Sequence, residues 1–312
     1  MLLNRGSGAV RTRRTDALRD ELASLFAEQG VTAAVEVVPS RNLREAAERA
    51  LAGFRSGQVR AVVVGGGDGS VRAVAGVVAG AGLPMGVLPL GTLNHFARDL
   101  GLPVELDAAV GVIAQGHTRR VDVAEVNGRV FVNNSSIGIY PLMVRDRDRR
   151  LRRGGWKKWP AMVVAGARAF WRFPLRRLSI CVEGRTEPFR TPCLFVGNNE
   201  YRLSLRGFGT REALDKGALW LGVAGSQSRA SLLWLGLRSA IGLIDSARDL
   251  QIVTAASAEI RAKTHRLLVA MDGEVEAIRA PLVYRARPGA LTVFAPTPEG
   301  GRPAPADAAE LA

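Results

Sequence analysis

The sequence predicts an α/β domain built on a parallel sheet, followed by a β-rich, sandwich-like domain. Strand and helix patterns alternate over residues 1–120, which is typical of a parallel sheet with helices on its faces. From Val121 onward the segments become shorter and turns more frequent, as in antiparallel β structure. We therefore expect one domain at 1–120 and another at 121–293, and the segment 294–312 can rejoin the first domain.

Each element is predicted from its hydrophobic pattern. In the first domain, the pattern predicts helices at residues 13–29, 42–54 and 71–80 and strands at residues 31–38, 60–64 and 85–88. In the second domain, short apolar runs between turns predict strands at residues 121–126, 129–133, 178–183, 193–197, 219–224, 259–262 and 267–271. Ligands of parallel sheets bind at loops beyond the carboxyl ends of the strands, so the loops after the second and third strands are the candidates.

Composition and charge restrict the class of protein. The chain has 312 residues, of which 47% are hydrophobic, and this is ample for a packed core. Its net charge of +14 attracts anionic partners such as nucleic acid, nucleotides or acidic lipid headgroups. Two cysteines do not suggest a disulfide framework and fit a reducing cytoplasm. No uncharged apolar run reaches the ~18 residues of a spanning helix, and the best candidate, 232–244, contains Arg238, so we expect no integral membrane protein.

The strongest local signal is the glycine-rich segment 62–76, VVVGGGDGSVRAVAG. An apolar strand runs into the loop Gly65–Ser70, and a helix follows at once. Glycines allow close approach of the backbone to a ligand, and a helix N-terminus offers free N–H groups to a phosphate. Asp68 suits Mg²⁺ or a catalytic hydroxyl. The loop is neither a Walker loop nor a GxGxxG fingerprint, and a glycine-rich turn without a ligand is the alternative.

A second polar loop, residues 89–97, follows the next predicted strand. Gly91 allows close approach, while Thr92 and Asn94 offer a hydroxyl and an amide. Two such loops at adjacent strand ends would build one crevice. The alternative is an ordinary N-capping turn in which Thr92 or Asn94 is the cap.

Six short motifs together resemble the diacylglycerol kinase catalytic-domain family, which includes sphingosine kinases and bacterial lipid kinases. In chain order they are NRGSG (4–8), GGGDGS (65–70), PLGTLNHFA (89–97), FVNNSSIG (131–138), VGNN (196–199) and MDGE (271–274). The resemblance spans residues 4 to about 294. It implies an N-terminal α/β nucleotide domain and a β-rich lipid-binding domain.

The resemblance also implies an activity and a set of site residues. It implies transfer of the γ-phosphate of ATP to a lipid hydroxyl, that of diacylglycerol or a related lipid, with Mg²⁺. It implies Asp68 and Asp122 near the metal, and Asp272 and Glu274 as acid/base groups in catalysis beside Asp68. Glu274 is the first choice as base. The residues that it implies around ATP are Asn4, Ser7, Ser40, Gly65, Gly66, Gly67, Asp68, Gly69, Ser70, Gly91, Thr92 and Asn94. For MDGE alone, a type I′ hairpin turn is the alternative.

Two positions depart from the family pattern. His95 stands where the family usually has Asp, and Lys216 stands where many bacterial members have a second Asp that helps to bind a structural magnesium. These departures, and a GGDG-type loop that NAD kinase shares, leave one further interpretation open each. One is a non-catalytic lipid- or nucleotide-binding regulator of the same fold, and the other is a soluble-substrate kinase related to NAD kinase.

The segment 145–174 combines a basic run with tryptophans and an apolar helix candidate. Arg and Lys suit anionic headgroups, and Trp suits a membrane interface. We expect this segment to contact an anionic membrane and the protein to be cytoplasmic, peripherally associated with the inner membrane face. A membrane is a more natural partner for this mixture than nucleic acid, which we do not expect. The alternative is a solvated helix whose apolar face packs on the β domain.

Overall fold

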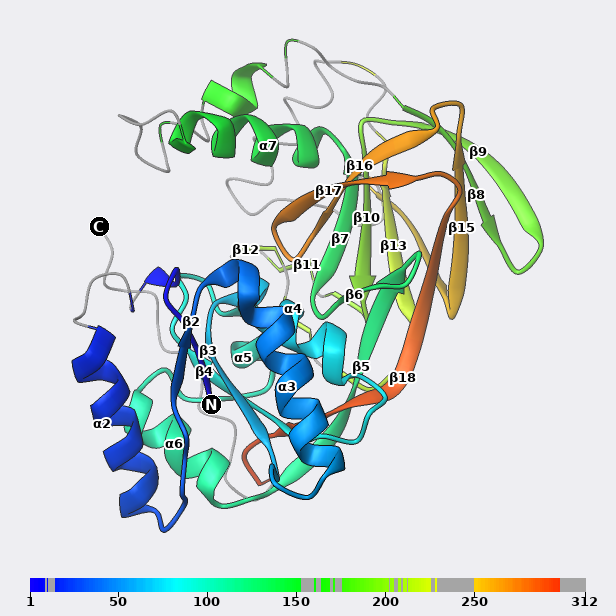
Figure 1. Ribbon diagram of the computed structural model, residues 1–312. Coiled ribbons are helices and arrows are strands. Elements are labelled where there is room, and N and C mark those ends of the chain that lie inside the picture. The colour runs from blue at the N-terminus through cyan, green and yellow to red at the C-terminus, as the bar shows by residue number, and fades with distance from the viewer. Residues whose placement is uncertain are drawn as a thin grey trace. The chain divides into compact units, whose positions relative to one another are not determined.

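The fold was analysed in a computed structural model (Figure 1). The structure describes residues 1–8, 10, 15–152, 160, 164–168, 171, 176–201, 203–204, 207–208, 210–211, 213–225, 228 and 250–297. Contacts divide the chain into two units. The first unit is Met1–Arg120 together with the chain from Leu291 onward, and the second is Val121–Ala290.

The first unit is built on a parallel sheet, as the alternating pattern predicts. Its strand order is β2 (Glu36–Val38), β1 (Leu2–Asn4), β3 (Val62–Gly66), β4 (Met85–Pro89) and the end of β18 (Leu282–Phe294). All of these neighbours pair in parallel. The carboxyl ends of β1, β3 and β4 therefore meet at one edge of the sheet.

Strand β2 is shorter than the predicted strand at residues 31–38. Its partner β1 is only three residues long, and the register pairs Leu2 with Glu36 and Asn4 with Val38. Residues before Glu36 have no paired strand beside them, so regular β structure begins only where the partner begins.

Helices cover the faces of this sheet (Figure 1). Helix α2 (Thr15–Glu28) buries Leu18, Leu22 and Phe26 at a spacing of four residues, so one stripe faces inward. These side chains pack with residues of β1, β3 and α6 (Leu106–Ala114) in one core cluster. Helices α3 (Leu43–Arg55) and α4 (Asp68–Val78) pack against each other. The short elements η1 (Ser40–Asn42) and α5 (His95–Asp99) complete the unit.

The second unit contains antiparallel β structure in two layers. One sheet has the order β14 (Leu250–Ala255), β13 (Leu219–Ala224), β10 (Cys193–Asn198), β7 (Asn134–Gly138), β16 (Arg266–Met271) and β17 (Glu274–Arg279). The other layer contains the start of β18, β15 (Ser257–Ala262), β8 (Arg176–Val182) and β9 (Arg185–Thr191), with β5 (Thr118–Val126) pairing with β6 (Arg129–Phe131). Side chains from both layers form one buried cluster, which is the arrangement of a sandwich.

The second unit also contains α7 (Ile139–Arg152) and the short strands β11 (Leu203–Ser204) and β12 (Gly207–Phe208). Among the described residues, no helix is both long enough and apolar enough to cross a membrane. The apolar segment 232–244, considered above as a spanning candidate, lies outside the described residues.

Candidate functional site

The two predicted polar loops touch each other at the carboxyl edge of the first unit's sheet. Strand β3 ends at Gly66, Gly67 is the single linking residue, and α4 begins at Asp68. The helix therefore starts three residues before the predicted start at residue 71, because the carbonyl of Gly67 accepts the N–H groups of Ser70 and Val71. A Cβ placed on Gly67 would lie 3.3 Å from Cα of Gly91, so the two backbones leave no room for a side chain.

Asp68 connects the two loops. Its carboxylate accepts the backbone N–H of His95 at 3.2 Å and of Phe96 at 3.0 Å, and it thereby caps the N-terminus of α5. Asn94 is the residue at the cap position, but its side chain makes no capping bond. The interpretation of the second loop as a turn capped by its own Thr92 or Asn94 is therefore wrong, because a side chain from the other loop caps the helix.

Asn94 instead folds its own loop. Its backbone adopts the left-handed conformation with a φ of 50°. Its side-chain oxygen accepts the N–H of Gly91 at 2.9 Å, and its amide donates to the carbonyls of Pro89 and Gly91 at 3.1 and 3.0 Å. Asn94 thus closes the turn from Pro89 to Gly91, while Thr92 lies exposed.

Asn4 joins three elements of the first unit. Its side-chain amide donates to Ser70 Oγ at 2.7 Å, and its side-chain oxygen accepts from Ser40 Oγ at 2.8 Å and from the N–H of Gly6 at 2.9 Å. The end of β1, the start of η1 and the first turn of α4 are therefore tied together. This arrangement brings the predicted nucleotide residues Asn4, Ser40 and Ser70 into direct contact.

Two features of this edge fit a phosphate group. Ser7 is buried, and its hydroxyl has no hydrogen-bond partner. Buried polar groups in native proteins are nearly always hydrogen-bonded, so an unpaired hydroxyl indicates a missing partner. Gly67 and Gly91 lie in close contact and carry no side chain, so a phosphate can approach the backbone at these two positions. The predicted residues of the first unit thus provide donors suited to a nucleotide phosphate.

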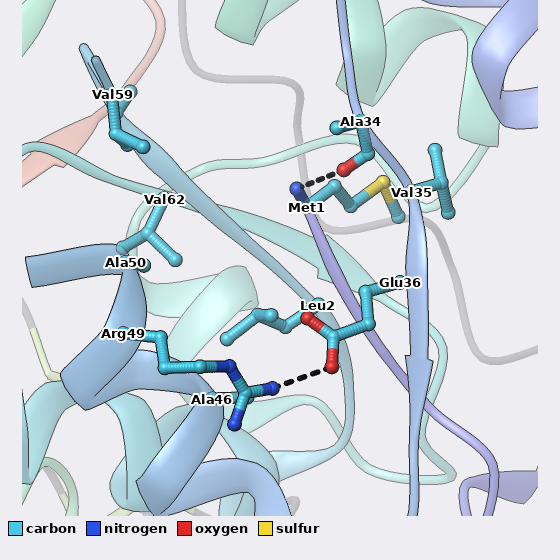
Figure 2. A pocket seen from close by; sticks show the side chains of 11 residues that line it. Met1, Leu2, Ala34, Val35, Glu36, Ala46, Arg49, Ala50, Val59 and Val62 are labelled. Atoms are coloured by element: carbon cyan, nitrogen blue, oxygen red, sulfur yellow. Dashed lines mark hydrogen bonds and ion pairs between the residues drawn. The ribbon is translucent and has the colours of Figure 1, made fainter. Parts of the chain in front are cut away.

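A separate cavity of about 320 Å³ lies elsewhere in the first unit (Figure 2). Its lining includes Leu2, Glu36 and Val62, each of which begins a strand of the parallel sheet. Figure 2 shows the ion pair between Glu36 and Arg49 beside this cavity, with 2.6 Å between the charged atoms. The cavity therefore lies at the amino ends of the strands, away from the two loops, and does not belong to the candidate site.

In the second unit, Asp122 is a buried carboxylate on β5 with a side chain only 1% exposed. One of its oxygens accepts the N–H of Gly217 at 2.6 Å and the other accepts the N–H of Gly289 at 2.7 Å. Its backbone carbonyl accepts from the amide of Asn198 at 2.9 Å. Asp122 thus fixes the backbone around it, and each oxygen keeps a second lone pair that a metal could use.

Asp272 lies in the hairpin turn between β16 and β17, and Glu274 follows that turn. The turn has φ angles of 47° at Asp272 and 82° at Gly273, as in a type I′ turn, so the turn interpretation is correct as geometry. The Asp272 carboxylate also accepts three backbone N–H groups at 2.8, 2.8 and 3.1 Å, those of Val132, Asn133 and Asn134. Glu274 begins β17 and is exposed. The two carboxylates therefore have different surroundings: Asp272 is fixed by the backbone and Glu274 faces solvent.

A buried, hydrogen-bonded pair, Ser135 and Tyr284, lies beside the residue that precedes this turn. Met271 pairs with Ser135 of β7, and Ser135 shares a hydrogen bond of 3.0 Å with the hydroxyl of Tyr284. Burial raises the pKa of Tyr284 far above its ordinary value, so the pair stays uncharged.

The predicted metal residues belong to different units, Asp68 to the first and Asp122 to the second. Among the described residues, no three His, Cys, Asp or Glu side chains come together as a metal-binding group. Their joint use around magnesium stays a prediction. The two departures from the family pattern, His95 and Lys216, both have exposed side chains. The backbone N–H of Lys216 donates to Asn199 at 2.9 Å.

The sequence did not point to Arg211. This residue is only 2% exposed and donates hydrogen bonds to Val132 and Asn133. Arginines are abundant in this chain, and nothing in the local pattern separates a buried one from the solvated majority. The only available signal was its position twelve residues after the VGNN motif.

We expect Gly91→Ala to weaken both nucleotide binding and stability. The new Cβ would collide with the backbone of Gly67, so the two loops must move apart. Overpacking of this kind costs about 1–3 kcal/mol, and a displaced cradle should lower ATP affinity at least about tenfold. Thermal unfolding and calorimetric titration with MgATP measure the two effects.

Gly111→Ala is the matched control for this change. Gly111 lies inside α6, and a Cβ there would have open space around it. Alanine is the better helix former by about 0.5–1 kcal/mol, so the control should gain stability and bind ATP normally. Wild-type ATP affinity in Gly91→Ala would contradict the assignment of these loops.

Comparisons with known proteins agree with the features of the first unit. A family model described as the diacylglycerol kinase catalytic domain matches residues 1–126. A diacylglycerol kinase of Staphylococcus epidermidis is 38% identical over 94 residues, which cover 30% of this chain and 28% of that protein. An uncharacterized protein of Synechocystis sp. is 26% identical over 244 residues, which cover 75% of this chain and 54% of that protein. The chain thus spans about half the length of these curated relatives or less.

A solved structure extends the likeness of the fold to nearly the whole chain. The crystal structure of a diacylglycerol kinase from Bacillus anthracis str. Sterne superimposes with a TM-score of 0.66 at 18% identity, covering 95% of this chain and 96% of that chain. At this identity the match concerns the fold alone. It confirms the expected class, a parallel α/β part followed by an antiparallel β part.

Proposed function

Residues 1–126 belong to the diacylglycerol kinase catalytic domain family, and on that premise we propose that this protein is an ATP-dependent lipid kinase. The proposed reaction moves the γ-phosphate of ATP to the hydroxyl of a membrane lipid, either diacylglycerol or a related lipid alcohol. The name of the Staphylococcus relative supports this class of acceptor.

The observation that carries the proposal is the pair of tied loops at the carboxyl edge of the parallel sheet. Asp68, in the first loop, accepts two backbone N–H groups of the second loop. Asn94 closes the second loop, and the backbones of Gly67 and Gly91 are in contact. Phosphoryl transfer depends mainly on positioning and on charge neutralisation, so two loops held in fixed positions suit it. The buried, unpaired hydroxyl of Ser7 supplies a further donor for a phosphate oxygen.

Asp68 and Asp122 are the residues that we propose for magnesium. Magnesium in kinases is usually bound by one or two carboxylates together with substrate phosphates, so a complete protein cage is not required. When bound, magnesium neutralises charge on the transferring phosphate. Asp68 lies between the two loops, where its carboxylate accepts the two N–H groups of α5.

Glu274 is proposed to take the proton of the lipid hydroxyl. It is exposed at the start of β17, where it can reach an acceptor group. Asp272 is proposed to act beside it, held by the backbone of Val132, Asn133 and Asn134.

The proposal is tested by incubating the protein with γ-labelled ATP and individual lipids. Suitable acceptors are diacylglycerol, monoacylglycerol, ceramide, sphingosine and phosphatidylglycerol in mixed micelles, with NAD as the soluble alternative. Labelled lipid that requires a divalent ion is the expected result. Label in NAD alone would favour a soluble-substrate kinase. Saturable ATP binding with no labelled product under any divalent ion would favour a non-catalytic regulator.

Contact with an anionic membrane through residues 145–174 is part of the same proposal. Helix α7 carries five arginines against two aspartates. Arg147 and Arg150 form ion pairs with Asp148 and Asp146 at 2.8 and 3.0 Å, whereas Arg149 is exposed. Trp171 is 70% exposed and suits an interface. The other tryptophans of the segment lie outside the described residues.

We expect Arg145→Gln with Arg149→Gln to weaken binding to anionic vesicles. Each basic residue near such a surface contributes about 1 kcal/mol, so the double change should lower the partition coefficient roughly 30-fold. Co-sedimentation with phosphatidylglycerol vesicles measures the change. Arg55→Gln with Arg60→Gln removes the same charge from exposed positions of the first unit and should have little effect. If both double substitutions weaken vesicle binding equally, residues 145–174 are not the membrane-binding segment.

A further inference from the structure

Arg211 is a fully buried cation with a specific set of partners. Its side chain is only 2% exposed. Nη1 donates to the carbonyl of Val132 at 2.6 Å and to that of Asn198 at 3.1 Å, and Nη2 donates to Oδ1 of Asn133 at 2.7 Å. The guanidinium also lies 5.6 Å from the centre of the Tyr201 ring. Two of these contacts reach residues 132–133, one at the backbone carbonyl of Val132 and one at the side chain of Asn133.

The same piece of backbone holds the carboxylate of Asp272. The N–H groups of Val132, Asn133 and Asn134 donate to Asp272, while the carbonyl of Val132 accepts from Arg211. The N–H of Asp272 in turn donates to the carbonyl of Asn134. Residues 132–134 therefore lie between Arg211 and Asp272 and contact both.

A second side chain ties this backbone to Asp122. The amide of Asn198 donates to the carbonyl of Val132 and to that of Asp122, both at 2.9 Å. The orientation of the Asn198 amide is thus determined by two acceptors. Arg211 also donates to the carbonyl of Asn198, so one buried set of hydrogen bonds supports both Asp122 and Asp272.

A buried guanidinium is costly unless each donor is used, and apolar residues often replace buried charges without loss of stability. The presence of a buried arginine at position 211 therefore calls for a geometric explanation. Arginine presents several donors in a rigid planar fork, which a lysine cannot reproduce. Small displacements of a reacting group can cost a large share of the rate, so a rigid support for Asp272 has a direct use in catalysis.

We propose that Arg211 is a positioning residue that fixes the Asp272 carboxylate through the backbone of residues 132–134. This inference rests on the proposed kinase function for its effect on rate, but its structural part can be measured without any activity. It assigns no contact with substrate to Arg211. It predicts that substitutions of Arg211 and Asp272 have non-additive effects on the rate.

The kinetic test is a double-mutant cycle. Arg211→Met should lower kcat about 10- to 100-fold and leave the KM for ATP within about twofold. In an Asp272→Asn background, the same change should lower kcat by less than about threefold, because the supported carboxylate is already absent. Arg211→Lys should recover part of the lost rate. Equal losses in the two backgrounds would overturn the proposal.

The structural test is amide hydrogen exchange in the full chain. In Arg211→Met, the amides of Asn133 and Asn134 should exchange at least about tenfold faster, while those of Leu221 and Val253 in the same unit keep their protection. Arg129→Gln removes an exposed arginine that pairs with Glu276 on the same hairpin and should change neither region. Unchanged exchange at Asn133 and Asn134, or uniform loss of protection across the second unit, would overturn the proposal. A wild-type protein that labels no lipid would reject the lipid-kinase function, and the exchange result would still decide the role of Arg211.

Discussion

Asp68→Ala is expected to lower the rate of phosphoryl transfer about 100- to 1000-fold, the range found when one preorganised electrostatic contact is lost. The change removes the carboxylate proposed for magnesium. It also removes the acceptor of the His95 and Phe96 N–H groups, so α5 loses its cap. A lost cap costs about 0.5–2 kcal/mol, and thermal unfolding should report that cost separately from the kinetic loss.

Asp68→Asn separates the two roles of this side chain. Asparagine keeps one acceptor oxygen for the cap but loses the negative charge. We therefore expect a smaller loss of stability than in Asp68→Ala, together with a similar loss of rate and a higher magnesium requirement. Asp107→Asn changes an exposed aspartate in the first turn of α6 and should leave rate and stability unchanged. Full activity of Asp68→Ala over a range of magnesium concentrations would remove Asp68 from the candidate site.

Glu274→Gln is expected to lower kcat about 100- to 10,000-fold without loss of stability, because a positioned general base contributes a factor of this size. Glu274 is exposed, and Gln keeps the length of its side chain, so the change is a mild one for the fold. The KM for ATP should change little. Single-turnover phosphorylation of the preferred lipid measures the chemical step directly.

Asp272→Asn is the informative comparison for Glu274→Gln. The Asp272 carboxylate accepts three backbone N–H groups, and an amide cannot accept all of them with equal geometry. Unpaired N–H groups cost about 1–3 kcal/mol, so this variant should lose stability as well as rate. Glu276→Gln, on the same strand and paired with Arg129, is the control. Near-normal kcat in Glu274→Gln, with a large loss in Asp272→Asn, would move the base to Asp272.

The two polar loops show how much of the local structure the sequence pattern predicts. An apolar run ending in glycines predicted the strand, the loop and the helix around Gly65–Ser70, since each depends on neighbouring residues. The helix begins at Asp68 rather than at residue 71, because a hydrogen bond from Ser70 to Gly67 closes the first turn. The resemblance also singled out Asn4 and Ser40, but their direct hydrogen bond is a property of folded strands.

The cap of α5 shows where local reasoning fails. Thr92 and Asn94 have the right side chains at the right spacing for a cap, and a local argument had to choose between them. Asp68, 27 residues earlier in the chain, accepts the N–H of His95 instead. Only the pairing of β3 with β4 brings that carboxylate to the second loop. Arg211 is a similar case, because its burial follows from neighbours that lie far away in sequence.

The carboxylates proposed for the site are implied only by the family resemblance and stay predictions. The sequence by itself predicted the fold class, many of the strands and helices in their order along the chain, and the two polar loops after the strands. These features follow from hydrophobic period, glycine placement and short motifs, all of which are local. Only the tertiary structure decided that Asp68 caps a helix of the other loop, that Asp122 is buried between two backbone amides, and that Asp272 is held by residues 132–134. Each of these depends on hydrogen bonds between segments that folding brings together, and no local pattern encodes such a partner.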